Sequence, residues 1–249
     1  MRRSVIAGNW KMYKTIDQTR AYFERFRPLV AHSTHCDIVI CPTFVNLEAG
    51  VAMVQGTRIE IGGQNLFWAK EGAFTGEISA GMLKAVGCEW VLIAHSERRQ
   101  YFGETDETAC KKTVAAIEAG LRPVVCIGEV LEERESGQTN LVLRTQIRGS
   151  IAPLSAEEFA RVVIAYEPVW AIGTGKTATP EIAEDAHRVI REEIKRHYGS
   201  RAAAACSILY GGSVKPDNIY RLMQQDNIDG ALVGGASLDP EAFAAIVNY

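Results

Sequence analysis

Short runs of apolar and β-branched residues recur along the chain, and within each run hydrophobic residues are almost continuous. Strands that are covered on both faces have this appearance, because neither face needs polar side chains. Eight such runs are present, at Ser4–Ala7, Asp37–Cys41, Arg58–Gly62, Trp90–Ala94, Pro123–Ile127, Val162–Tyr166, Ser207–Tyr210 and Gly230–Val233. The pattern therefore predicts eight strands of a parallel sheet.

Amphipathic segments with helix-terminal residues lie between these runs. Thr15 to Gln18 has the pattern of a capping box, and Thr179-Pro180-Glu181 combines a cap, a first-turn proline and an acidic residue. We expect the helix that follows Thr179 to stop at Gly199, since glycine is favoured just past a helix end. The same signals predict a helix from Thr105 to Gly120, a shorter helix ending at Gly87, and a last helix at Pro240–Val247.

Eight strand–helix units in 249 residues predict an α/β fold, a single (β/α)8 barrel over residues 1–249. A doubly wound open sheet is the alternative. It is less favoured because no G-x-G-x-x-G opens the first unit and because the units continue evenly to the end of the chain. No linker-like stretch divides the sequence, so we expect no domain boundary.

Charge and cysteine content narrow the possible function. Lys and Arg number 27 against 30 Asp and Glu, a net charge of −3, which argues against general nucleic-acid binding but permits a local cationic site. There is no apolar stretch long enough for a membrane span, and the first apolar run stops at Asn9, too early for a signal peptide. None of the six cysteines forms a C-x-x-C pair. We expect reduced thiols, no metal site and a cytoplasmic protein.

In a barrel the functional site forms at the carboxyl ends of the strands, so polar residues that follow the apolar runs are candidates. Asn9 and Lys11 follow the first run, His95 and Glu97 the fourth, and Glu167 the sixth. An amide, an ammonium, an imidazole and one or two carboxylates would thus meet on one rim. Taken singly, each has a more ordinary interpretation, a structural histidine or a solvated charge. The remaining histidines are expected to be solvated: His32, His35, His187 and His197.

Two glycine turns, Gly211-Gly212-Ser213 and Gly234-Gly235, follow the last two runs. Each alone is a weak signal, since Gly-Gly also makes ordinary tight turns. On adjacent strands they favour phosphate binding, because glycine lets the backbone approach an anion and because a helix start follows Gly235.

The connection after Glu167 carries Trp170 and Ile172 in its middle and small residues near its end. It fits an ordinary packed surface loop. It also fits a lid with one hinge at Pro168–Trp170 and another at Lys176–Ala178.

Together these residues resemble the triosephosphate isomerase family, and the likeness covers essentially the whole chain. Five long strings carry it, in family order: Ala7–Met12, Gly72–Ser79, His95–Arg99, Ala165–Gly175 and Leu209–Val214. The resemblance implies a cofactor-free enzyme that interconverts dihydroxyacetone phosphate and D-glyceraldehyde 3-phosphate through an enediol(ate), a step of glycolysis and gluconeogenesis.

The resemblance also implies roles for individual residues. Glu167 would be the base, His95 the electrophile, Lys11 an electrostatic anchor and Asn9 a polar donor beside it. Asn9 and Lys11 would contact the substrate, and the backbone of Gly173, Ser213, Gly234 and Gly235 would hold its phosphate. Supporting positions would be Ser96, Glu97 and Cys126. The lid would comprise Pro168, Val169, Trp170, Ala171, Ile172, Gly173, Thr174, Gly175, Lys176, Thr177 and Ala178.

A homodimer is the expected assembly, without nucleic acid or membrane. The connection at residues 63–79 is long for a compact barrel and carries Phe67, Trp68 and Phe74, apolar groups that a monomer would expose. A loop folded onto its own barrel is the alternative. The resemblance places this loop in a pocket of a second subunit, with contacts from Gln64, Asn65, Phe74 and Thr75.

Two residues depart from the family pattern: Tyr13 replaces a smaller polar residue, and Ala94 replaces a common glycine before His95. Two other functions remain open on the sequence. Lys11 would serve as a Schiff-base amine in a barrel aldolase, and a barrel without activity would act as a binding scaffold.

Overall fold

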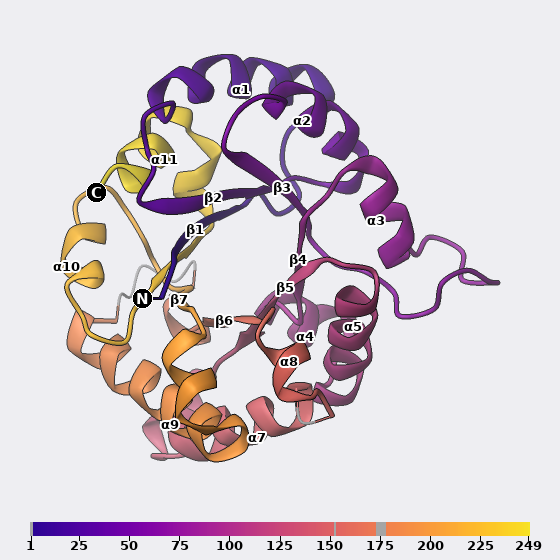
Figure 1. Cartoon of the computed structure of the whole chain (residues 1–249). Coiled ribbons are helices and arrows are strands. Elements are labelled where there is room, and N and C mark those ends of the chain that lie inside the picture. Colours follow the sequence, from indigo (N-terminus) through magenta and orange to yellow (C-terminus); the bar gives the residue numbers. More distant parts are fainter. Residues whose placement is uncertain (1, 152, 173–177) are drawn as a thin grey trace.

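The computed structural model describes residues 2–151, 153–172 and 178–249, and within them eight parallel strands form a closed barrel (Figure 1). Neighbours in the barrel follow chain order, and β1 pairs with both β2 and β8. The strands are β1 (Ser4–Asn9), β2 (Cys36–Cys41), β3 (Ile59–Gly63), β4 (Trp90–Ile93), β5 (Arg122–Ile127), β6 (Val163–Tyr166), β7 (Ile208–Tyr210) and β8 (Gly230–Val233). The predicted (β/α)8 barrel is confirmed, with strand ends within two residues of expectation.

Helices form the outer layer around the strands (Figure 1). In the described chain they are α1 (Ile16–Leu29), α2 (Leu47–Val54), α3 (Ala80–Val86), α4 (Ser96–Phe102), α5 (Asp106–Glu118), α6 (Leu131–Glu135), α7 (Thr139–Ile151), α8 (Ala156–Phe159), α9 (Pro180–Ala205), α10 (Ile219–Met223) and α11 (Pro240–Val247). Three 3₁₀ turns accompany them: η1 (Phe44–Asn46), η2 (Val169–Ala171) and η3 (Gly235–Leu238). The connections after β4 and β5 therefore hold more helices than the single one expected.

The barrel wall separates two apolar clusters, which explains the continuous hydrophobic runs. Side chains alternate between the faces of a strand. In β1, Val5 and Ala7 join an inner cluster, whereas Ile6 belongs to the larger cluster under the helices. Both faces are thus buried, so the strand has no position for a solvated polar residue until its end.

Most predicted helix signals act as expected. Thr15 and Gln18 form a reciprocal capping box, Thr179 caps α9 through the Ile182 amide, and Gly87 ends α3 in the left-handed region at φ 104°. The expected stop at Gly199 is confirmed, because the first helical piece of α9 ends there. Gly199 is non-helical (φ 83°, ψ 171°), but a second helical piece follows directly and extends α9 to Ala205. Glycine here produces a kink.

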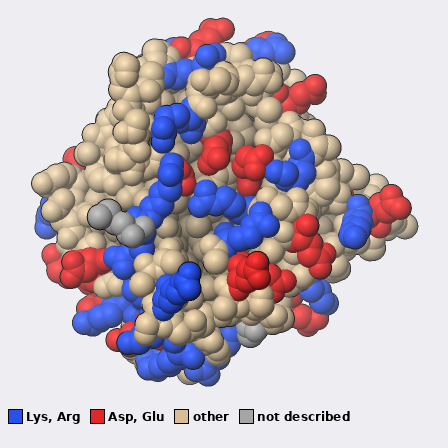
Figure 2. All heavy atoms as spheres, in the orientation of Figure 1, with Lys and Arg blue, Asp and Glu red and all other residues tan. Residues whose placement is uncertain are grey.

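Ion pairs cover the amino ends of the strands. Asp37 accepts from Arg3 and lies 3.2 Å from Arg122, and Asp229 accepts from Arg191 at 2.6 Å. Figure 2 shows basic and acidic side chains side by side at the centre of this face. Charges of both signs satisfy one another here, so this end of the barrel stabilises the fold and leaves the carboxyl ends for chemistry.

The helical layer contains a buried carboxylate that joins α7 to α9. Glu193 is fully buried and lies 2.7 Å from Arg148 Nε and 2.9 Å from Arg196 Nη1. Because these arginines are half exposed, solvent screens part of the attraction. We predict that Glu193→Gln lowers the free energy of unfolding by about 2 kcal/mol.

Urea denaturation measures this loss, with Glu192→Gln as the control because Glu192 is its exposed neighbour on α9. An equal, small effect for both substitutions would show that the buried pairing contributes nothing.

Candidate active site

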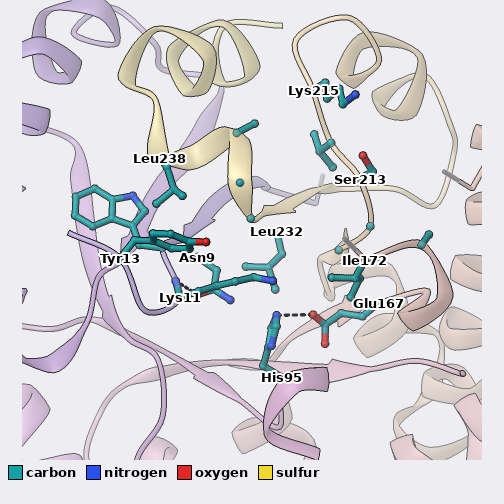
Figure 3. Close-up of a pocket in the computed structure, with 18 residues that line it drawn as sticks. Asn9, Lys11, Tyr13, His95, Glu167, Ile172, Ser213, Lys215, Leu232 and Leu238 are labelled. Atoms are coloured by element: carbon teal, nitrogen blue, oxygen red, sulfur yellow. Dashed lines mark hydrogen bonds and ion pairs between the residues drawn. The ribbon is translucent and has the colours of Figure 1, made fainter. Parts of the chain in front are cut away.

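The carboxyl ends of the strands enclose a hollow of about 550 Å³ (Figure 3). Its wall includes a side chain or backbone from the ends of β1, β4, β6, β7 and β8. The predicted residues that the structure brings together in it are Asn9, Lys11, His95, Glu167, Ser213, Gly234 and Gly235. Residues separated by more than two hundred positions in sequence thus share one wall. Predicted residue Gly173 lies outside the described residues.

Glu167 follows β6, and its carboxylate is held between two donors. The residue is 2% exposed. Its Oε1 lies 2.8 Å from His95 Nε2 (Figure 3). Its Oε2 accepts from the Ser96 amide at 2.8 Å. Ser96 was predicted as a supporting position, and its support comes from the backbone at the start of α4. A helix start favours a negative charge, so the carboxylate has a stabilised place inside the protein.

The protonation state of His95 follows from its hydrogen bonds. The Glu97 amide donates to His95 Nδ1 at 3.3 Å, so Nδ1 carries a lone pair and Nε2 carries the proton that faces Glu167. Burial lowers the pKa of His95, but the Glu167 carboxylate raises it more, and the net direction is upward while the two side chains touch. Moving Glu167 away would remove that influence and favour the neutral ring.

Lys11 is fixed by an unusual backbone as well as by its charge. Its φ of 52° lies in the left-handed region, which costs a lysine about 1–2 kcal/mol. Asn9 Oδ1 accepts from the Lys11 amide at 3.0 Å, and Gln64 Nε2 donates to the Lys11 carbonyl at 2.8 Å. The ammonium lies 2.6 Å from Glu97 Oε1, so Glu97 is its ion-pair partner. These contacts fix the direction in which the Lys11 side chain enters the hollow.

The two turns contain glycine for different physical reasons. A Cβ on Gly211 would lie 2.9 Å from Glu167 Cγ, and one on Gly212 would lie 2.2 Å from the Tyr210 hydroxyl oxygen. Packing therefore requires glycine at both positions, against the Glu167 side chain at Gly211 and against Tyr210 at Gly212. A Cβ on Gly235 would meet nothing within 4 Å, and one on Gly234 would lie 3.5 Å from Lys11 Cε. The backbone of the second turn thus faces open space next to a cation, as an anion site requires.

Ala94 and Cys126 stand behind the reactive groups. Ala94 has a φ of 56°, so the alanine carries strain that the family's common glycine avoids. Cys126 lies in the inner cluster of the barrel, and burial, followed by the Glu167 charge, raises the pKa of its thiol well above the usual range. A thiol with that pKa stays protonated, so its contribution is packing. Tyr13, the other departure, borders the hollow and is largely exposed.

Sequence analysis missed Glu129, which anchors the start of the predicted lid. It is fully buried, and its Oε1 accepts from the Tyr166 hydroxyl and from Trp170 Nε1, each at 3.0 Å. Arg134 pairs with it at 3.3 Å and lies over the Trp170 ring. Ile172 lines the hollow. The rest of the predicted lid, Gly173 to Thr177, lies outside the described residues.

The expectation that His187 is solvated was wrong. It is completely buried, with its ring edge-on to Tyr166 and its Nδ1 3.1 Å from the Asn227 carbonyl. Burial lowers the pKa of His187 to about 3, so it stays neutral. Its position on the inward face of α9 makes it a core residue, which helical spacing relative to Ala183 and Ile190 would have indicated.

The described residues contain neither a metal-binding cluster nor a membrane-spanning helix. Across residues 2–151, 153–172 and 178–249, there is no group of three or more His, Cys, Asp or Glu residues able to bind a metal ion. Among those residues no helix has both the length and the apolar character needed to cross a membrane.

Known proteins resemble the chain over its full length. The family model described as triosephosphate isomerase matches residues 4–249. The chain is 63% identical to the triosephosphate isomerase of Solibacter usitatus, with all of both chains covered. It is 53% identical to those of Clostridium beijerinckii and Geobacter metallireducens, over all of this chain and 100% and 99% of theirs.

Glu167 depends on a glycine that sequence analysis did not single out. A Cβ on Gly128 would lie 1.7 Å from the Glu167 carbonyl oxygen, so Gly128→Ala must displace the backbone that carries the carboxylate. We predict a loss of kcat on the order of 10²-fold, because small displacements of a reacting group have effects of this size.

Steady-state assays with circular dichroism separate this loss from unfolding. The control is Gly50→Ala in α2. Its Cβ would make ordinary contacts of 3.5 Å or more with side chains of neighbouring elements. A folded Gly128→Ala variant with unchanged kcat would show that Glu167 needs no such placement.

Proposed function

The chain belongs to the triosephosphate isomerase family and interconverts dihydroxyacetone phosphate and D-glyceraldehyde 3-phosphate, and we propose that Glu167 is the base that moves the proton. The observation that carries this proposal is the contact of Glu167 Oε1 with His95 Nε2 at 2.8 Å, on the wall of a hollow that Lys11 also lines. A base, a neutral donor and a cation therefore border one space the size of a small phosphorylated sugar.

The proton transfer has two half-steps. The Glu167 carboxylate takes a proton from the carbon next to the substrate carbonyl, and the electron pair of that C–H bond forms the enediolate. The hydroxyl proton on the first carbon then moves to the enediolate oxygen on the neighbouring carbon, and Glu167 returns a proton to that neighbouring carbon, so the new carbonyl forms at the first carbon. A positioned base typically contributes about 10²–10⁴-fold. Glu167 must leave the Ser96 amide and the His95 ring to reach carbon, so substrate binding has to replace those two hydrogen bonds.

His95 and Lys11 would stabilise the developing oxyanion. The Nε2–H of His95 points into the hollow once Glu167 turns away, and the Lys11 ammonium enters from the β1 side (Figure 3). Donors fixed before the reaction need no reorganisation, and losing one such donor costs roughly 3–4 kcal/mol of barrier in other enzymes. Asn9 supports this task by accepting from the Lys11 amide, which holds the strained lysine in place.

The substrate phosphate would occupy the open space at Ser213, Gly234 and Gly235. Their backbone amides are suited to an anion, and the Lys11 side chain passes directly beside Gly234. The proposal also assigns Gly173 to this group, although that residue lies outside the described part of the chain.

We propose that residues 168–178 act as a lid. Support comes from the described residues at its two ends. At the first end, Trp170 donates to buried Glu129 and Ile172 lines the hollow. At the second end, Ala178 is buried. Closure would exclude water from the enediolate phosphate and protect it from side reactions.

An aldolase that forms a Schiff base at Lys11 is disfavoured by the same geometry. A Schiff base requires a lysine nitrogen that is free to attack a carbonyl carbon, whereas Lys11 Nζ is engaged by Glu97 Oε1 at 2.6 Å.

We propose a homodimer in the cytoplasm. The segment between β3 and α3 projects from the barrel (Figure 1), and Phe74 near its tip is 45% exposed. Met12, next to Lys11, is 91% exposed, so a second subunit could cover an apolar side chain beside the site. Gln64 and Asn65 bind groups of their own chain, the Lys11 carbonyl and Lys112. The six described cysteines are all free thiols, which suits a reducing compartment.

We predict that Glu167→Asp keeps the fold and loses kcat by about 10²-fold, since the carboxylate retreats by one C–C bond. A coupled enzyme assay measures kcat, and Glu24→Asp is the control, because Glu24 is exposed on α1. Unchanged kcat in Glu167→Asp would remove Glu167 from the role of base.

The lid proposal predicts leakage of the intermediate. An exposed enediolate phosphate expels inorganic phosphate and forms methylglyoxal. Deleting residues 172–175 should therefore raise the methylglyoxal formed per turnover, which a colorimetric assay normalised to substrate consumed will detect. A slow variant that makes no additional methylglyoxal would show that the lid lacks this protective role.

The dimer proposal predicts that activity falls on dilution below the dimer dissociation constant. The double variant Phe74→Asp/Thr75→Arg should sediment as a monomer and have low kcat, because Lys11 loses a neighbouring surface. Tyr220→Asp, on exposed α10, is the matched control. Sedimentation of a fully active monomer at assay concentration would contradict this proposal.

A further inference from the structure

Lys14 has a backbone conformation that calls for an explanation. Its φ is 74°, and among the described residues only two other non-glycine residues have positive φ, Lys11 and Ala94. Those two carry or adjoin the proposed catalytic groups. Such strain persists only where surrounding contacts impose it, and it tends to accumulate at functional sites. Lys14, however, has no place in the mechanism described above.

The contacts of Lys14 connect two loops of the active site. Its Nζ donates to the Leu238 carbonyl at 2.8 Å, and Leu238 is the last residue of η3. The ammonium also lies over the rings of Trp10 and Tyr22, 5.2 and 4.9 Å from their centroids. Asn46 Nδ2 donates to the Lys14 carbonyl at 2.7 Å and so fixes the strained residue from its other side.

The loop joined by Lys14 is the one that presents the phosphate-binding backbone. η3 begins at Gly235, directly after Gly234. Trp10 Nε1 donates to the Ser237 carbonyl at 3.1 Å, and Ser237 Oγ donates to the Gly234 carbonyl at 2.7 Å. Lys14 therefore joins the β1 loop to η3. The β1 loop carries Lys11, and the Lys11 side chain lies beside Gly234, which directly precedes η3.

We propose that Lys14 is a positioning residue for the substrate phosphate, which sets the spacing between the Lys11 ammonium and the backbone amides of Gly234 and Gly235. The proposal rests on the proposed function of these groups. Burial lowers the pKa of Lys14 although Asp239 raises it, as expected for an ammonium held against rings and a carbonyl. Without the ammonium, η3 keeps the Trp10–Ser237 hydrogen bond but loses its second link to the β1 loop, and the two halves of the phosphate site gain freedom to move apart.

The test compares Lys14→Met and Lys14→Gly with Lys195→Met, which removes an exposed lysine on α9. Inorganic phosphate serves as a competitive inhibitor. We expect Ki for phosphate and KM for the substrate to rise about tenfold in both Lys14 variants, as for loss of one hydrogen bond to a charged group. We expect kcat to change less than KM, within about threefold, because Lys11 keeps its own contacts with Asn9 and Glu97.

Urea denaturation separates positioning from stability. Lys14→Gly lacks the ammonium but also lacks the left-handed strain, so it should be at least as stable as Lys14→Met and still bind phosphate weakly. A Ki that recovers along with stability in Lys14→Gly, or a Ki equal to wild type in both variants, would overturn the proposal. Absence of isomerase activity in the wild type and in Lys195→Met would instead overturn the function on which it rests.

Discussion

The buried carboxylate of Glu167 is the constraint on which the rest of this site depends. A carboxylate that is removed from water must find hydrogen-bond donors, or it is strongly destabilised. Here the two donors are the His95 ring and the Ser96 amide, each 2.8 Å away. Neither donor is an arginine or a lysine, so Glu167 is held by two hydrogen bonds and not by a salt bridge to a permanently charged side chain. That requirement explains why α4 must begin at Ser96 and why Gly128 and Gly211 lack side chains.

Glu97 links the two other polar side chains at this edge of the hollow, Lys11 and His95. Glu97 neutralises Lys11 while its backbone amide donates to His95 and fixes the ring's tautomer. The cation then remains oriented without drawing Glu167 away from its two donors. Backbone strain at Lys11, Lys14 and Ala94 is concentrated around the same hollow, and side-chain amides such as Asn9 and Asn46 hold it. Folding free energy is thus used to keep the reactive groups in place before substrate arrives.

The sequence predicted the features that follow from local patterns. Strands buried on both faces produce continuous apolar runs, and the first polar residue after each run marks the barrel rim, so Asn9, His95 and Glu167 could be found without a structure. Tertiary contacts decide the rest. Glu129 resembles any loop glutamate until Trp170 and Tyr166 are seen to donate to it, and the requirement for Gly128 arises only from the approach of Glu167. The local signal at Gly199 correctly predicts the end of the first helical piece of α9, but it could not predict the second piece that follows directly to Ala205.

The most direct test of this account is isomerisation of dihydroxyacetone phosphate in D₂O, followed by nuclear magnetic resonance of the D-glyceraldehyde 3-phosphate trapped early. If a carboxylate base moves the proton through an enediolate, product from the wild-type enzyme carries solvent deuterium on C2, and Glu167→Gln forms this product far more slowly. Product without solvent deuterium would indicate direct hydride transfer between the carbons. That result, or undiminished deuterium incorporation by Glu167→Gln, would contradict the central role given to Glu167.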